Sequence, residues 1–168
     1  MIVVPDSGPL IHLASVKQFS LLKRFFHTIH NIPQVYEEVV TQGQGRAGDF
    51  DVRQALQERW LLVDAAVDPA SVRRFIAAIV SETDAAVIAS AIMRKATLLL
   101  ADDRVAREMA RREGLAAMGT VGILVQARVK GFVVDRLQLL LDRLIATGFY
   151  LDPAGRVYQD ALRRVGEL

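Results

Sequence analysis

Residues 97–114, TLLLADDRVAREMARREG, constrain the fold more than any other stretch of the chain. The apolar run at 97–101 is typical of a strand buried on both faces, and it ends at two adjacent acids, Asp102 and Asp103. An amphipathic helix follows, with Gly114 just past its expected end. Because open α/β folds build their ligand sites at the carboxyl ends of strands, this turn is the expected seat of function.

Short apolar runs alternate with helical patterns along the whole chain. Parallel strands need crossover connections, so this order predicts an α/β fold, a three-layer α/β/α sandwich with a central, mostly parallel sheet of four to five strands. The expected strands are residues 2–5, 29–32, 60–63 (a candidate edge strand), 97–101 and 116–118. The expected helices are 10–14, 19–26, one from 33, 51–58, 69–80, 81–93, 104–113, one ending at 130, 135–147 and 153–165.

Length and composition predict one domain over residues 1–168, closed by C-terminal helices within 135–168. A chain of this length buries about 70% of the surface that it exposes when unfolded, and 52% of its residues are hydrophobic. The glycine-rich stretch 42–49 is interpreted as a mobile loop and not as a domain linker.

The absence of cysteine excludes a disulfide framework, a thiolate zinc site and a thiol nucleophile, and it favours the reducing cytoplasm as the compartment. Only three histidines are present, so a histidine-bound metal is not expected. The chain begins without a basic leader and contains no apolar run of the roughly 18 residues that span a membrane. We therefore expect a cytoplasmic protein without a membrane partner.

The formal net charge is only +2, so the overall balance says little about nucleic acid. Basic residues nevertheless gather around the acidic turn, which fits either a solvated helix face or a surface that contacts a polyanion. In the second interpretation Arg104 and Arg107 hold an RNA backbone, in a contact that weakens with salt. The basic residues of this group are Arg94, Lys95, Arg104, Arg107, Arg111 and Arg112.

Acids from distant segments are expected to share one edge of the sheet. Asp6 follows the first strand, as Asp102 and Asp103 follow a later one, while Glu38 and Asp84 lie one turn inside helices that can pack over the same edge. Each also has an ordinary structural interpretation. Asp6, Asp84 and Asp103 can cap helices, and Glu38 can belong to a solvated pair.

Two features favour an acidic cluster over isolated caps. One acid is enough to cap a helix, yet Asp102 and Asp103 stand side by side, and Asp84 opens a helix that is too apolar to face water. Carboxylates gathered without cations repel one another and are costly to desolvate. All-oxygen ligation points to Mg²⁺ or Mn²⁺.

The same residues stand in motifs that resemble those of PIN-domain ribonucleases. Residues 119–124 and 148–151 are similar to a VapC-like branch of that family. The motifs are Asp-Ser-Gly-Pro-Leu-Ile from Asp6, Ile-Pro-x-Val-x-x-Glu ending at Glu38, Ser-x-x-Asp-x-x-Val-Ile-Ala from Ser81, and Leu-Leu-x-Asp-Asp-Arg ending at Arg104.

The resemblance implies a metal-dependent endoribonuclease that uses no covalent protein nucleophile. It also implies the toxin of a toxin-antitoxin pair, silenced by a small cognate antitoxin protein and commonly a homodimer. The implied catalytic residues are Asp6, Glu38, Asp84 and Asp103; the implied ligands of one or two Mg²⁺ or Mn²⁺ ions are Asp6, Asp84 and Asp103, supported by Asp102. Ser7 would orient Asp6, and Thr120 would lie near the site.

The chain departs from the family pattern in two places. Ala101 stands where many members have Ser or Thr, and Ser81 precedes Glu82 where the VapC-like branch often has Gly-Glu. The second departure leaves Glu82 as an alternative to Asp84 for the third acid. A binding module that has lost catalysis and acts through a protein partner remains the alternative function. A phosphoacceptor receiver domain is disfavoured because the acidic pair comes late in the chain.

Overall fold

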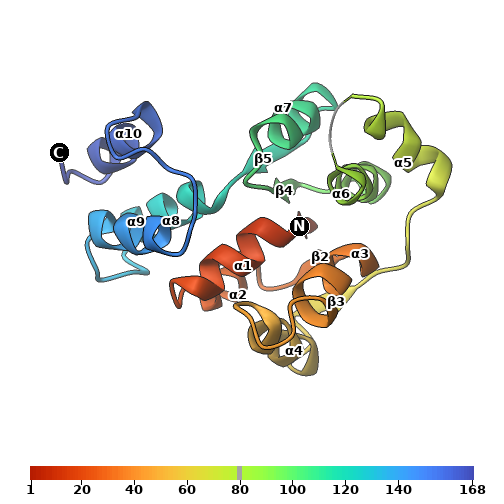
Figure 1. The fold of residues 1–168 in the computed structure, drawn as a ribbon, viewed down its shortest axis with the longest axis horizontal. Helices are drawn as coiled ribbons and strands as arrows, with labels where there is room; N and C mark the ends of the chain where they lie inside the picture. The colour runs from red at the N-terminus through yellow and green to blue at the C-terminus, as the bar shows by residue number, and fades with distance from the viewer. Residues whose placement is uncertain (79–80) are drawn as a thin grey trace.

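The computed structural model describes residues 1–78 and 81–168, and over these ranges strands alternate with helices, which confirms the α/β class (Figure 1). All pairings among the described strands are parallel. Hydrogen bonds join them in the orders β1-β4-β5 and β2-β3, and β1 lies beside β2, so the strands form one layer in two bonded groups. The strands are β1 (Val3–Pro5), β2 (Ile29–Asn31), β3 (Leu61–Val63), β4 (Leu98–Leu100) and β5 (Ala116–Met118).

The helices follow the predicted order, with ends that differ by a few residues: the helices expected over 10–14 and 51–58 begin earlier than expected, and several others end earlier. The helix expected over 69–80 ends at Ile76, and Val80 lies outside the described residues. None of the helices that the structure describes is long and apolar enough to cross a membrane. The helices are α1 (Ser7–Ser15), α2 (Ser20–Phe26), α3 (Pro33–Tyr36), the π-helix η1 (Glu37–Thr41), α4 (Asp49–Gln57), α5 (Pro69–Ile76), α6 (Glu82–Met93), α7 (Arg104–Arg112), α8 (Thr120–Val129), α9 (Leu137–Ala146) and α10 (Arg156–Arg164).

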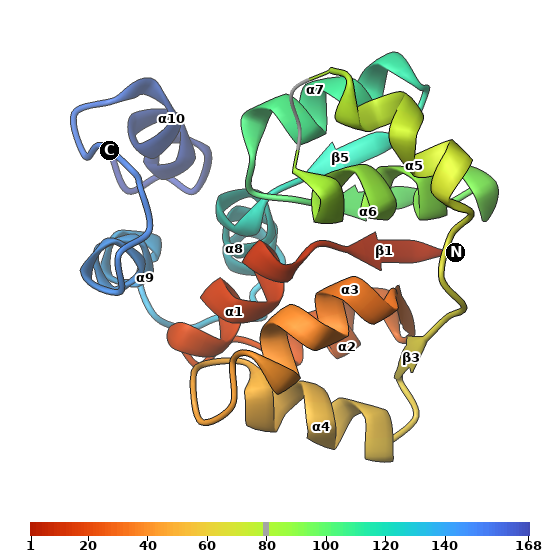
Figure 2. The ribbon, with the colours of Figure 1, turned by 45° about the vertical axis from the view of Figure 1, so that its right-hand side comes forward.

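The strands lie between two groups of helices, which gives the three-layer arrangement. Figure 2 shows α5, α6 and α7 on one side of β1 and α1 to α4 on the other. Both faces of the sheet are therefore dry, and Val3, Val4, Leu99 and Leu100 are fully buried. In α6 every residue from 85 to 91 is buried, as its nearly uniform apolar sequence predicts.

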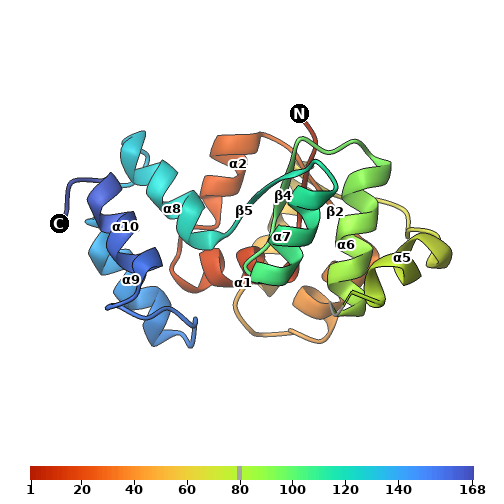
Figure 3. The ribbon, with the colours of Figure 1, turned by 90° about the horizontal axis from the view of Figure 1, so that it is seen from above.

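The C-terminal helices form a group at one end of the molecule, at the left in Figure 3. Glu167, which follows α10, accepts hydrogen bonds from the backbone N–H groups of Leu137 and Gln138 at 2.8 and 2.9 Å, so it caps the start of α9. The hydroxyl of Tyr158 in α10 donates to Asp142 in α9 at 2.7 Å. These contacts fix α10 against α9, across a groove from α7.

Candidate active site

Asp6 is a buried carboxylate at the carboxyl end of β1. It occupies the N-cap position of α1, but its side chain makes no capping hydrogen bond. Its backbone N–H donates to the carbonyl of Leu100 in β4 at 2.7 Å, which fixes it at the sheet edge. The residue is only 8% exposed, and among the described residues its Oδ1 atom has no hydrogen-bond partner. The capping interpretation therefore does not explain Asp6.

Two of the other predicted acids surround Asp6. Burial and the negative charge of Asp84 raise the pKa of Asp6 from an ordinary 3.8 to about 7, and Glu38 adds to the rise. The backbone N–H of Ser7 hydrogen-bonds the Asp6 carboxylate and lowers its pKa against this trend. Asp6, which follows β1, thus lies near Asp84 in α6 and Glu38 in η1.

Glu38 reaches this place from a π-helix. The hydroxyl of Thr83, in the first turn of α6, donates to Oε1 of Glu38 at 2.6 Å and ties η1 to α6. π-helical turns are rare and often occur at functional sites. Sequence reasoning expected an ordinary helix here and missed Thr83, because no local pattern distinguishes this threonine from other residues in a helix start.

The structure shows which of the two candidate acids, Asp84 or Glu82, lies beside Asp6. The hydroxyl of Ser81 accepts a hydrogen bond from the backbone N–H of Asp84 at 3.1 Å, so Ser81 caps α6. The Asp84 side chain is half-buried and faces Asp6, whereas Glu82 is exposed to solvent. Of the two acids left open by the sequence, Asp84 is therefore the one beside Asp6.

Asp102 lies in a second, fully bonded cluster. Its Oδ1 accepts from the backbone N–H of Thr120 at 2.6 Å, and its Oδ2 accepts from the Thr120 hydroxyl at 2.8 Å. Nδ1 of His12 in α1 lies 2.7 Å from the same Oδ2. Thr120 is fully buried. No sequence pattern predicted a role for His12, because a lone histidine in a short helix has no spacing or motif that marks it.

Backbone packs closely around the Asp102 carboxylate. A Cβ atom at Gly119 would lie 2.9 Å from Oδ1, and one at Gly8 would lie 3.1 Å from Oδ2. A side chain at Gly119 would force the carboxylate to move, and one at Gly8 would require it to shift by a few tenths of an ångström. Arg107 donates from Nη1 to the carbonyls of Ala101, at 3.0 Å, and Asp102, which fixes the turn from the other side.

Asp103 takes a different position from the one expected. Its side chain accepts a hydrogen bond from the backbone N–H of Ala106 at 2.8 Å and caps α7, and the residue is exposed. Neighbouring residues past a strand end point in opposite directions, so Asp102 turns inward and Asp103 turns outward. The structure brings Asp103 to the helix cap and not to the acids around Asp6.

The donor chemistry of the acidic cluster fits a hard divalent cation. Asp6, Glu38 and Asp84 offer only carboxylate oxygens, and the buried Oδ1 of Asp6 still lacks a partner among the described residues. As the side chains stand in residues 1–78 and 81–168, no three carboxylates or histidines are gathered closely enough to hold a metal ion. The cluster is therefore a loose one that a cation would have to draw together.

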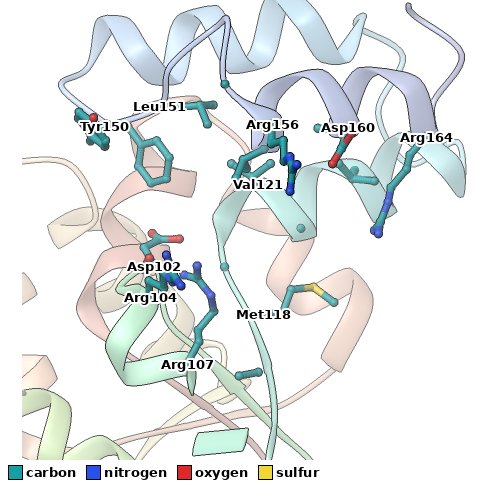
Figure 4. A pocket seen from close by; sticks show the side chains of 18 of the residues that line it. Asp102, Arg104, Arg107, Met118, Val121, Tyr150, Leu151, Arg156, Asp160 and Arg164 are labelled. Carbon is teal, nitrogen blue, oxygen red and sulfur yellow. Dashed lines mark hydrogen bonds between the residues drawn. The ribbon is translucent and has the colours of Figure 1, made fainter. Parts of the chain in front are cut away.

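The predicted RNA-contacting arginines line a groove. Nε of Arg104 pairs with Glu108 at 2.7 Å, and the guanidinium of Arg107 is bound to backbone carbonyls. Both residues border a cavity of about 710 Å³ that also reaches Asp102 and lies between α7 and α10 (Figure 4). Arg107 therefore supports the turn and contributes positive charge to the groove at the same time.

A double-mutant cycle is expected to show coupling between Thr120 and Asp102. We expect Thr120→Val and Asp102→Ala to be non-additive by about 1–2 kcal/mol in the free energy of unfolding, because each removes the same charged hydrogen bond. Urea unfolding measures the four proteins. A parallel cycle of Thr120→Val with Glu82→Gln should be additive, because Glu82 is exposed on another helix. Additivity in both cycles would show that the hydrogen bond from the Thr120 hydroxyl to Asp102 contributes no measurable free energy to the stability of the fold.

Comparison with known proteins gives one family match. A family model described as a PIN domain (DUF3368) matches residues 2–167. The search of curated proteins finds no significant match. Among solved structures, a PilT N-terminus domain protein from the hyperthermophilic archaeon Sulfolobus solfataricus P2 is similar, with 16% identity and a TM-score of 0.48; the match covers 76% of this chain and 93% of that one.

Proposed function

Because the chain belongs to the PIN-domain family, whose fold is generally that of a nuclease, we propose that it is a metal-dependent endoribonuclease that hydrolyses RNA phosphodiester bonds. The observation that supports this proposal is the group of acids around the buried Asp6. Asp6, Glu38 and Asp84 come from three separate segments, and burial together with the negative charges of Asp84 and Glu38 raises the pKa of Asp6 to about 7. A chain retains such a cluster at a cost in stability, which a bound cation offsets.

In this proposal Asp6, Asp84 and Glu38 hold Mg²⁺ or Mn²⁺. When bound, a divalent ion lowers the pKa of a water molecule and offsets charge on the leaving oxygen. The protein's own residues hold and orient the acids. Thr83 holds the Glu38 carboxylate through its hydroxyl, and the backbone N–H of Ser7 orients the carboxylate of Asp6. Asp102 supports the site from the adjacent cluster.

The wild-type protein is expected to cleave RNA only when a divalent ion is present. The test incubates it with end-labelled single-stranded and hairpin RNAs in Mn²⁺, in Mg²⁺ and in EDTA, and resolves the products on a gel. We expect cleavage in Mn²⁺ or Mg²⁺ and intact RNA in EDTA, because in this proposal the bound ion lowers the pKa of the attacking water. Cleavage that continues in EDTA, or none with any RNA or ion, would contradict the proposal.

A binding module without catalysis is the second candidate. The looseness of the acidic cluster over the described residues favours it, since no complete ligand set is assembled. Titration of Mn²⁺ into the protein by calorimetry separates the two functions. Saturable binding that Asp6→Asn abolishes supports the nuclease, whereas no heat of binding together with no cleavage supports the binding module.

The finer proposal is that this nuclease is a VapC-like toxin. It is supported by the similarity of residues 119–124 and 148–151 to that branch of the family. The proposal includes a small antitoxin partner and a homodimer. Within residues 119–124, Thr120 donates two hydrogen bonds to the Asp102 carboxylate and Gly119 leaves room for it, which gives this part of the motif a physical role.

A further inference from the structure

The groove beside Asp102 has two basic walls. One wall is α7, with Arg104, Arg107 and Arg111, and the other is α10, with Arg156 and Arg164. Figure 4 shows Asp102, Arg104 and Arg107 at one end, Tyr150 above them, and Arg156, Asp160 and Arg164 of α10 along the opposite wall. Five arginines border a cavity of about 710 Å³, and Asp102, Asp152 and Asp160 are the acids among its lining residues.

The acids of the groove are already occupied. Asp160 pairs with Arg163 at 2.7 Å, the Asp152 carboxylate accepts from the backbone N–H of Ala154 at 2.9 Å, and Asp102 is bound by Thr120 and His12. Of the three, only Asp160 has its charge paired by an arginine outside the groove lining, but the five arginines outnumber the acids, so the groove keeps an excess of positive charge.

The two arginines of α10 are the cations most available to a ligand. On the α7 wall, Arg104 pairs with Glu108 and Arg107 binds carbonyls, so both are partly committed. In the part of the chain that the structure describes, no carboxylate forms an ion pair with Arg156 or Arg164, and both are exposed. A polyanion entering the groove would therefore find its strongest unpaired charges on α10.

An exposed aromatic side chain stands at the same groove. Tyr150 is 95% exposed, although it follows Phe149, which packs edge-on against the ring of His12 at 4.8 Å between centroids. Phe149 thus anchors the segment while Tyr150 presents its ring to solvent. An exposed ring beside arginines is the arrangement on which single-stranded nucleic acids stack their bases.

We propose that the groove between α7 and α10 binds one single-stranded segment of RNA, with phosphates on Arg156 and Arg164 and a base stacked on Tyr150. This inference rests on the proposed ribonuclease function and extends it to a subsite and a strand type. A duplex keeps its bases paired and stacked, so it has no base to offer Tyr150. The groove reaches Asp102, so a strand lying in it would run toward the acids.

Binding without cleavage tests this proposal. The full chain is titrated in EDTA against a fluorescent oligoribonucleotide of about ten nucleotides, within the usual range of single-strand sites, and anisotropy gives Kd. Arg156→Ala and Arg164→Ala should each weaken binding and reduce the slope of log K against log salt by about 0.7. Tyr150→Ala should weaken binding about fivefold or more through lost stacking.

Arg73→Ala is the matched control. It removes the same charge from exposed α5, which lies at the opposite end of the molecule from α10 in Figure 1, and it should leave the RNA affinity within about twofold. Circular dichroism and thermal unfolding check that every variant keeps the fold. A variant of Arg164 that folds like the wild type and binds RNA equally well would overturn the proposal.

Two further ligands, an RNA duplex and polyglutamate, test which class of molecule binds in the groove. A duplex of the same sequence should bind more weakly than the single strand, and Tyr150→Ala should leave the affinity for the duplex unchanged. If the duplex bound as tightly as the single strand and lost as much affinity in Tyr150→Ala, the single-strand assignment would be overturned. If Arg156→Ala abolished binding of polyglutamate while RNA affinity stayed unchanged, the groove would be a site for an acidic protein segment. EDTA removes divalent ions, so these experiments measure RNA binding without cleavage. A wild-type protein that binds RNA in this groove but does not cleave it with Mn²⁺ or Mg²⁺ would refute the proposed nuclease function and leave the binding proposal intact.

Discussion

Replacing Asp6 by asparagine is expected to abolish metal-dependent RNA cleavage, with a loss of about 10³-fold in kcat/KM, equivalent to roughly 4 kcal/mol. Asparagine keeps the shape of the side chain but removes the negative charge at the centre of the acidic cluster. Asp6 is the most buried of these acids and carries the oxygen that lacks a partner among the described residues. The loss should therefore be larger than for any exposed acid.

Glu82→Gln is the control for this experiment. It removes one negative charge from the first turn of α6, the turn that also carries Asp84, but Glu82 is exposed. Its initial rates of Mn²⁺-dependent cleavage should stay close to those of the wild type. If Asp6→Asn retained full activity with an unchanged circular dichroism spectrum, the acidic cluster would not be the catalytic site.

The second large effect is that Asp6→Asn should stabilise the metal-free protein at pH 8. The pKa of Asp6 is about 7 in the folded protein and 3.8 in its ordinary environment, because burial and Asp84 disfavour the charged form. A difference of about three units corresponds to roughly 4 kcal/mol as an upper limit. For a chain of this size even half of that raises Tm by about 4–8 °C.

The pH dependence has a definite sign. Between pH 4 and pH 7 the folded state keeps a proton on Asp6 that the unfolded chain releases, so the stability of the wild type falls as the pH rises through this interval. Below pH 4 both states are protonated at Asp6 and the penalty is absent. The gain from Asp6→Asn should therefore be full at pH 8, smaller at pH 6 and absent below pH 4.

Urea unfolding in EDTA at these three pH values measures the effect, and added Mn²⁺ should stabilise the wild type but not the Asp6→Asn variant. If the substitution destabilised the protein equally at every pH, Asp6 would serve as an ordinary hydrogen-bonding residue. A variant that is more stable and inactive would instead show that the chain retains Asp6 at the expense of stability, as functional sites often do.

The sequence alone predicted the order of the elements and most of the acidic cluster. Apolar runs followed by helical patterns placed Asp6 at the end of β1, and the motifs placed Glu38 and Asp84 on helices that cover that edge. The placement of the strands depends on periodicity, which is a local property of the chain, whereas the assignment of Glu38 and Asp84 depends on the resemblance of the motifs to a known family. The roles of these acids in catalysis remain predictions.

What the sequence determined by itself is the layered α/β fold, because residue spacing encodes strands and helices, and their alternation calls for parallel strands. Only the tertiary structure decided that Asp102 turns inward to Thr120 and His12 while Asp103 caps α7. It alone also decided that α10 faces α7 across a basic groove. Such outcomes depend on side-chain direction and on packing between segments far apart in the chain, and no short stretch of sequence carries that information.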